Sequence, residues 1–588
     1  MIRWRALPAL LAAPAWGCLS VPERTAECDV TADCDSAHGE VCEEGVCWGN
    51  PPVGTFAAVI LPPSERDELA PREVASIPIE LDGWMPDLQL ETPVKFSGRI
   101  EEACDPLVLC THASIAATIT ITRPSRFYGG PGFKRVVISQ PDADGTSFEV
   151  ALPRPDGSDA SYELTIVPEG RGATPTMGTT AAQAVPPLRM TLSAASNVTS
   201  KTIGLGGVDL PTVDGMIANG GNGLANYRVV ALGRWTPGAP RTEVSTVAYT
   251  DGTGTYHLVL SSGLVDDVEI VAKPFGTALL PTLHLTDVPA TTSSAGRNLA
   301  LPAGIGSATT LTLPVTGTDA GGQIDPVAGA RATLTATIAT GPNAFATFSA
   351  EATTDSGGIA SLPVLDGPAI NAAYRLAIVP PASSSLGVVF DQPVTYALEQ
   401  APLLLPERVV IRGVVRAVNG EPLEDVSVTA RPSLRFLWSL DATQQAFLSA
   451  IPAATAVSDN RGGFVLPVDA MIAQTWGHYD LVFEPAVTAR APTWVVSEIA
   501  IPGATSAPTV EVADVTLPDA AFVHGAITDP FGSVVEGAEV KVFQALSEAR
   551  SPLCDEVPNS PDSCPVPAPL HGRGVADAQG IVRLTLPR

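Results

Sequence analysis

Lysine is scarce in this chain: only five of its 34 basic residues are lysines, and 62 acidic residues give it a formal net charge of -28. Nucleic acids and anionic membrane surfaces are bound through basic patches, so this composition argues against both as direct partners. We attribute the acidity to solubility. With 588 residues, 52 Gly and 55 Pro, the chain is long enough for several domains, and it suits short strands and turns better than long helices.

Catalytic and metal-binding patterns are also lacking. The seven histidines are scattered, and none has the spacing of a metalloprotease helix. Residues 354–358 resemble the serine motif of trypsin-like proteases, but they coincide with a repeated turn whose other copies have no serine at the position of Ser356. Asp33 and Asp35 suggest calcium, yet solvated carboxylates explain them as well. We therefore predict no catalytic residues, no metal and no cofactor.

Long apolar runs are missing beyond the N-terminus. Arg3 and Arg5 precede a short apolar stretch, so we interpret residues 1–17 as a signal peptide. The sequence Ala15-Trp16-Gly17-Cys18 resembles a bacterial lipoprotein lipobox. This resemblance implies acylation of Cys18, which would attach the exported protein to the cell envelope or outer-membrane surface. Ordinary signal cleavage at the same bond is the alternative, and the protein would then be secreted.

Nine cysteines are present, and eight remain after Cys18 is set aside. An even set in an exported chain predicts disulfides. Four lie within twenty residues in a polar module at 18–50 that needs covalent links to fold, and their spacing is unlike that of a zinc site. We predict disulfides within three local groups: Cys28, Cys34, Cys42 and Cys47; Cys104 and Cys110; Cys554 and Cys564.

A short motif recurs along the chain: an aspartate, two variable residues, a glycine and a short apolar run. Its aspartates are 109, 104, 104 and 118 residues apart, which is the length of a small β domain. Asp favours the first position of a type I turn, and Gly accepts the positive φ that ends it. We predict structural turns at five places: Asp142 to Gly145, Asp251 to Gly254, Asp355 to Gly358, Asp459 to Gly462, and Asp577 to Gly580.

Alternating segments follow these turns. In one of them, Tyr162, Leu164 and Ile166 would face a core while Glu163 and Thr165 face solvent, as in an antiparallel sandwich sheet. Each unit carries the same succession of short motifs, and their clearest copies are residues 537–542, 459–464 and 479–483. This succession resembles that of the carboxypeptidase regulatory-like domain, a transthyretin-like β-sandwich. The resemblance covers roughly residues 90–588, and it implies a fold rather than an activity.

We therefore predict an all-β chain, a tandem array of about five Ig- or transthyretin-like antiparallel β-sandwiches after the cysteine-rich module. Units one to four end at Leu-Pro pairs, and the fifth stops where its last strands should begin. We expect either a fragment of a longer protein or completion by a partner's strand. The expected units are 51–211 with a leading segment, 212–314, 315–406, 407–518 and an incomplete 519–588.

The function that these features favour is that of a non-catalytic cell-surface lipoprotein, a structural or adhesion-type array with an unknown protein or glycan partner. A carbohydrate-binding array is an alternative, but aromatics are only 5% of the chain. Several of them, including Phe148, Tyr162, Tyr256 and Phe464, fall on expected core positions. An accessory region for a peptidase acting in trans is a second alternative. In the insertion 433–450, Trp438 and Phe447 could form an exposed apolar patch, but we expect both to fold back onto their own sheet.

Overall fold

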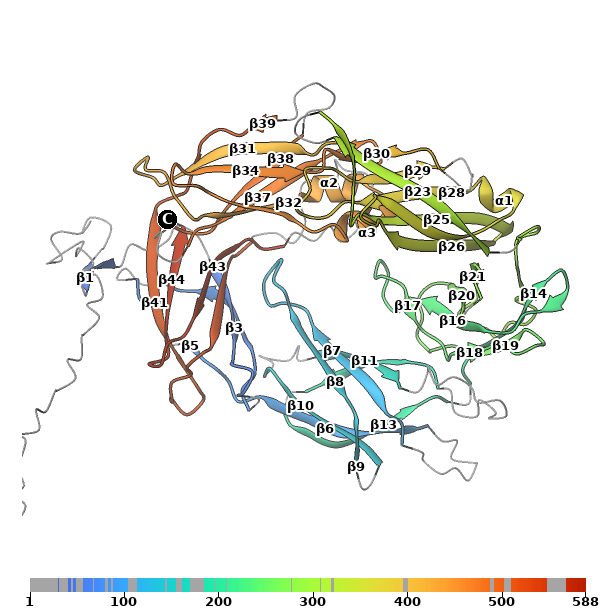
Figure 1. The fold of residues 1–588 in the computed structure, drawn as a ribbon. Coiled ribbons are helices and arrows are strands. Elements are labelled where there is room, and N and C mark those ends of the chain that lie inside the picture. Colours follow the sequence, from blue (N-terminus) through green and yellow to red (C-terminus); the bar gives the residue numbers. More distant parts are fainter. Residues whose placement is uncertain are drawn as a thin grey trace, which may run out of the picture.

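A computed structural model describes Val30 and residues 41–43, 46–48 and 56–587, with gaps at 67, 80–82, 86–87, 104–113, 143–144, 155–160, 170–184, 195, 208, 277, 307, 319–321, 395–399, 487–490, 502–508 and 547–566. The fold is all-β and multi-domain, as predicted (Figure 1). Strands form five two-layered β-sandwiches, numbered 1 to 5 below. Among the described residues, no helix is both long and apolar enough to cross a membrane.

Sandwiches 1 and 2 share one topology. In sandwich 1, the first sheet has the order β13-β6-β10-β9 and the second β12-β11-β7-β8. The strands are β6 (Val94–Glu102), β7 (Ala117–Arg123), β8 (Phe133–Ile138), β9 (Gln140–Asp142), β10 (Gly145–Leu152), β11 (Ser161–Pro168), β12 (Leu188–Ser193) and β13 (Val198–Leu205). Sandwich 2 has β14 (Thr212–Asn219), β15 (Asn222–Gly223), β16 (Tyr227–Gly233), β17 (Thr242–Glu243), β18 (Ala248–Tyr249), β19 (Thr255–Val259), β20 (Val268–Pro274), β21 (Thr282–Val288) and β22 (Leu299–Ala300).

Sandwiches 3 and 4 repeat the plan and add short helices. Sandwich 3 has β23 (Ala308–Thr318), β24 (Ile324–Pro326), β25 (Arg331–Gly341), β26 (Ala344–Thr353), β27 (Ile359–Leu365), α1 (Pro368–Asn371), β28 (Tyr374–Val379), β29 (Val389–Pro393) and β30 (Leu403–Leu404). Sandwich 4 has β31 (Val409–Arg416), β32 (Ser427–Pro432), α2 (Leu434–Ser439), α3 (Ala442–Ser449), β33 (Ala454–Val457), β34 (Gly463–Val468), β35 (Met471–Ile472), β36 (Thr475–Trp476), β37 (His478–Glu484), β38 (Trp494–Ala500), β39 (Thr509–Glu511) and β40 (Val515–Thr516).

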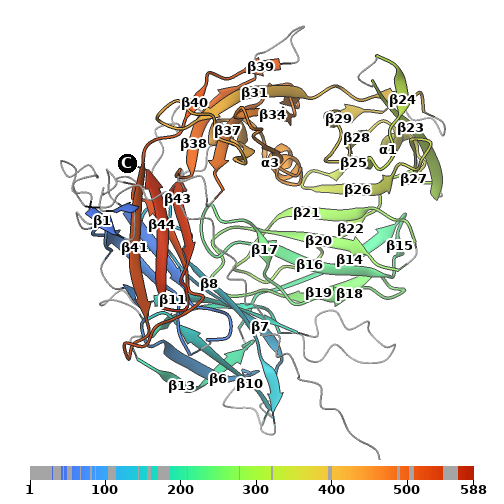
Figure 2. The ribbon, with the colours of Figure 1, turned by 60° about the vertical axis from the view of Figure 1, so that its left-hand side comes forward.

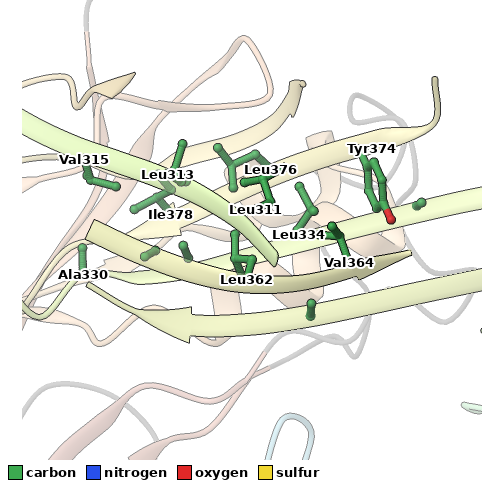
Figure 3. Packing of buried hydrophobic residues seen from close by; sticks show 14 of the residues in the cluster. Leu311, Leu313, Val315, Ala330, Leu334, Leu362, Val364, Tyr374, Leu376 and Ile378 are labelled. Carbon is green, nitrogen blue, oxygen red and sulfur yellow. The ribbon is translucent and has the colours of Figure 1, made fainter. Parts of the chain in front are cut away.

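Each core lies between two sheets and is filled from alternating strand positions. In β11, the side chains of Tyr162, Leu164 and Ile166 are fully buried and Glu163 is exposed, as predicted. Figure 3 shows the equivalent core of sandwich 3, where Leu334, Leu376 and their neighbours from both sheets interdigitate. In sandwich 4, the helices close over the core and bury Phe436 and Trp438, so the insertion does fold back onto its own sheet.

Sandwich 5 is built from two distant parts of the chain. Residues 520–587 supply β41 (Ala520–Thr528), β42 (Glu539–Gln544), β43 (Leu570–Val575) and β44 (Ile581–Pro587). Residues 56–90 supply the other three strands, β3 (Phe56–Leu61), β4 (Arg72–Ile77) and β5 (Leu88–Gln89). Strand β3 pairs with β42 along six residues, and β5 runs parallel to β41. Blue and red strands therefore lie side by side in Figures 1 and 2.

This arrangement corrects two expectations. The segment leading into the first sandwich belongs to the fifth, whose core includes Phe56, Ile60 and Leu90 from that segment. The strands expected to be missing from 519–588 are supplied by residues 56–90 of the same chain, so the expectation of an incomplete fifth sandwich is wrong. The supplied strands occupy the expected positions in the two sheets, because β3, β4 and β5 pair as β11, β12 and β13 do in sandwich 1.

The sandwiches follow one another around a closed circuit (Figure 2). Sandwiches 2 and 3 share a nine-stranded sheet, because β21 pairs with β26 from Thr282–Thr347 to Leu285–Ala344. Sandwich 1 contacts sandwich 2 through Ser261, whose hydroxyl donates to the carbonyl of Pro187 at 2.6 Å. Sandwich 5 contacts its two neighbours through aromatic rings. The ring centroids of Trp494 in sandwich 4 and His571 are 6.2 Å apart, and those of Phe127 in sandwich 1 and Phe543 are 5.7 Å apart.

Candidate functional site

The predicted turns share one hydrogen-bond pattern. At Asp459, the backbone carbonyl accepts from Gly462 N–H at 2.8 Å, and the carboxylate Oδ1 accepts from Arg461 and Gly463 N–H at 2.8 Å each. These donors hold the pKa of Asp459 below its usual value. Gly462 has φ 75°, the conformation that favours glycine. The same pattern is found at Asp355 and Asp577. At Asp251 the carboxylate accepts from the N–H and the hydroxyl of Thr253, while Thr255 N–H donates to the Thr253 hydroxyl oxygen instead.

The first copy is described only in part. Asp142 ends β9 and Gly145 begins β10, and the two residues pair across the hairpin. Residues 143 and 144 lie outside the described residues. A sixth turn of the same kind lies outside the five predicted copies: Asp529 accepts from Gly532 N–H through its carbonyl and from Phe531 and Ser533 N–H through its carboxylate. The Asp-x-x-Gly spacing at 529–532 was the available signal.

A hydroxyl before three of the turns was also missed. Thr250, Thr354 and Ser458 are buried, and each accepts from a backbone N–H at the start of the central strand of the second sheet. Thr354 also donates to Val327 O at 2.7 Å. These bonds tie the turn of one sheet to the neighbouring sheet. The residue pair Ser/Thr-Asp at the same repeat position was visible in the sequence.

The cysteine predictions fall mostly outside the described residues. Cys18, Cys28, Cys34, Cys104, Cys110, Cys554 and Cys564 all lie there. Cys42 and Cys47 are directly opposite each other in the hairpin of β1 (Val41–Glu43) and β2 (Val46–Trp48). Ser356 stands in the Asp355 turn, as expected from the repeat. Within the described part of the chain, no three His, Cys, Asp or Glu side chains gather as a metal site would require.

A cavity with a mixed polar and apolar lining lies between sandwiches 3 and 4. Its volume is about 780 Å³, and it is lined by the start of β29, the connection 406–409, the tip of α3 and the β35–β36 hairpin. Its apolar lining includes Phe390, Met471 and Trp476, and its polar lining includes Glu407 and Gln474. A volume and a mixed lining of this kind are typical of small-molecule sites.

A buried ion pair forms the floor of this cavity. The Arg408 and Asp469 side chains are 6% and 9% exposed, and Arg408 Nε lies 3.4 Å from Asp469 Oδ1. The same Oδ1 accepts Val388 N–H at 2.9 Å, while Arg408 donates to the carbonyls of Ala382 and Ser384. Because these partners come from both sandwiches, the pair clamps them together. The buried charges are hydrogen-bonded on several sides, as burial requires.

Three left-handed residues line the same cavity. Ala473 has φ 46° and Gln474 has φ 66°, so the two-residue turn of the β35–β36 hairpin is built without glycine. Asp391 on the facing wall has φ 54°. Such conformations cost energy for residues with a Cβ and are often kept at functional sites. This strain marks the cavity as the candidate site.

Comparisons with known proteins give only distant matches. No protein-family model matches the chain, and no curated protein does. Among solved structures, the minor pilin GBS52 of Streptococcus agalactiae is 14% identical, with 36% of this chain and 97% of that chain covered and a TM-score of 0.18. The full-length pilus protein RrgB of Streptococcus pneumoniae is 12% identical, with 73% and 98% covered and a TM-score of 0.13. At these values, the likeness extends neither to the arrangement of the sandwiches nor to a function.

Proposed function

We propose that this protein is a non-catalytic structural or adhesion-type protein of the bacterial cell surface, attached through a lipid on Cys18. The observation that carries the proposal is the series of specific junctions between the sandwiches. A shared sheet joins sandwiches 2 and 3, and the buried pair Arg408–Asp469 joins 3 and 4. Junctions of this kind favour a scaffold with fixed relative orientations over a flexible string of domains.

Cell fractionation tests the location. Wild type should partition into detergent, carry acyl chains by mass spectrometry and be cut by protease added to intact cells. Cys18→Ala should be exported but should stay in the aqueous phase, since a single apolar anchor is lost. Cys42→Ala is the matched control, because it removes a cysteine without touching the signal. Recovery of unacylated wild type in the cytosol would contradict the proposal.

Glycan binding at the cavity between sandwiches 3 and 4 is the second candidate. Trp476, Glu407 and Gln474 all line this cavity. Sugars are held by aromatic stacking and by hydrogen bonds to carboxylates and amides. A glycan array with wild type and Trp476→Ala tests it, with Trp235→Ala in sandwich 2 as the control. Binding that depends on Trp476 alone supports the candidate, and equal binding by all three proteins rejects this cavity.

A further inference from the structure

The segment 56–90, named here the donor segment, enters the interior of sandwich 5. Strand β3 is an inner strand of the sheet β4-β3-β42-β43 and pairs with β42 from Phe56–Gln544 to Leu61–Glu539. Ala58, Ile60, Met85 and Leu90 are fully buried. Without the donor segment, residues 520–587, the acceptor half, would expose the edge of β42 and one side of their core.

Contacts between donor segment and acceptor half among the described residues are backbone pairing, packing and polar bonds. Gln89 Nε2 donates to Asp529 O at 3.0 Å across 440 positions, and Met85 N–H donates to His524 O at 2.8 Å. Arg66 Nη2 lies 3.5 Å from the carboxylate of Asp529. None of these interactions requires that both parts belong to one molecule. The donor segment of a second copy would make the same bonds.

The donor segment is attached to sandwich 1, and the acceptor half to sandwich 4. Only residues 90–93 separate β5 from β6, and Phe127 of sandwich 1 packs on the outer face of β3 with Ala57 and Val59. At the other end, residues 517–519 connect β40 to β41. If the donor segment separates from the acceptor half, the donor segment stays attached to sandwich 1 and the acceptor half stays attached to sandwich 4.

We propose that the acceptor half takes the donor segment of a second copy of this chain, so that copies join head to tail or in reciprocal pairs. The contacts of sandwich 5 are then the same within one molecule and between two, as in domain swapping. Closure within one copy prevails in dilute solution, because donor and acceptor are held on the same chain, and exchange between copies rises with the concentration of copies. This inference holds whether or not Cys18 is acylated.

Complementation between two full-length variants tests the exchange. Ala58→Glu disables the donor, because Ala58 is fully buried opposite Val542. Val542→Glu disables the acceptor at the same contact. Each variant alone should be monomeric by native mass spectrometry, since neither has a good donor and a good acceptor to offer another copy. Mixed in equal amounts, they should form a 1:1 complex with one intact sandwich 5.

Ser76→Glu and Val575→Glu are the matched controls, since both positions are exposed on the same two parts. Their mixture should give no more complex than wild type. Absence of a complex from the disabled pair, with sandwiches 2 to 4 melting as in wild type, overturns the proposal. A complex of Ala58→Glu with a foreign chain, and none with Val542→Glu, overturns the assignment to a second copy.

Wild type provides a measurement that is independent of folding defects in the variants. Isotope-labelled and unlabelled chains are mixed at concentrations from about 10 μM to about 1 mM, because association between copies rises with concentration. Hybrid dimers should rise with concentration and should disappear when residues 56–90 are deleted from both chains. Monomers alone across the whole range overturn the proposal.

Discussion

Sandwiches 4 and 5 have one topology but are built differently from the chain. In sandwich 4, β32 pairs with β37 of the same continuous segment, whereas in sandwich 5 the equivalent strand β42 pairs with β3 from the start of the chain. Their turns nevertheless match, with φ 75° at Gly462 and 74° at Gly580. The comparison shows that the same sandwich forms whether its strands come from one continuous segment or from two distant ones. The sequences of the strands and turns determine the fold, and the distance along the chain changes only the entropy lost when the strands pair. That entropy is larger for sandwich 5, because its loop is about tenfold longer, which costs roughly 2 kcal/mol more.

We expect the largest effect from a substitution in the donor segment that destabilises the whole of sandwich 5. Ala58→Glu should destabilise sandwich 5 by about 4–5 kcal/mol, because it buries an unpaired carboxylate. Hydrogen exchange should show lost protection in 520–587 as well as in 56–90. Leu481→Glu, at the equivalent strand of sandwich 4, should affect only residues 409–516. Unchanged protection of 520–587 in Ala58→Glu would show that the acceptor half is stable alone.

A second comparison concerns the junctions. Asp469→Leu leaves Arg408 buried without its ion pair and should destabilise the unit formed by sandwiches 3 and 4 by about 3 kcal/mol. The double variant Arg408→Met/Asp469→Leu should recover most of this loss, since two apolar side chains need no partner. Calorimetry of the three proteins decides it. A double variant as unstable as the single one would mean that the hydrogen bonds of Arg408 to carbonyls matter more than the pair.

The turn glycines offer a smaller and local effect. Gly462→Val should destabilise sandwich 4 by about 1–3 kcal/mol, because valine resists positive φ. A Cβ there would also lie 2.3 Å from Val415 O. Gly420→Val is the control, since φ is 85° but no atom lies within 4 Å. It should cost less than Gly462→Val, and equal costs would assign the whole effect to φ. In either variant, sandwiches 1 and 5 should melt unchanged.

The smallest effect is a pH dependence confined to sandwich 5. Burial lowers the pKa of His571, which lies between Phe56 and Trp494, below its usual 6.5. The unfolded chain therefore binds a proton at higher pH than the folded chain. Stability from this group is present above pH 6.5 and declines as pH falls towards the folded pKa. Thermal melts between about pH 7.5 and 5.5 should show this decline, and His571→Gln should remove it. An unchanged slope in His571→Gln would assign the pH dependence elsewhere.

Local features of this molecule could be predicted from sequence, and long-range ones could not. The Asp459 turn and the alternation in β11 depend on neighbouring residues, so composition and spacing sufficed. Residues 56–61 are apolar on both faces because sandwich 1 covers their outer side, and this hid the strand alternation. The following Pro62 and Pro63 repeat the prolines at the end of β11 and directly after β37, which were the available signal. The ion pair of Arg408 and Asp469 depends on how two domains dock, and no local pattern encodes it.

Because sandwich 5 is built from both ends of the described chain, its two parts are synthesised at different times. A ribosome makes residues 56–90 long before residues 520–587, and at roughly 5–20 residues per second the delay is on the order of a minute. During that delay, β3 is an apolar strand whose intended neighbour does not yet exist. Sandwiches 1 to 4 can complete themselves as they emerge, but this strand must remain unpaired or be shielded. Chaperones therefore meet an apolar, unpaired strand early in synthesis and can release it only after residues 520–587 have emerged.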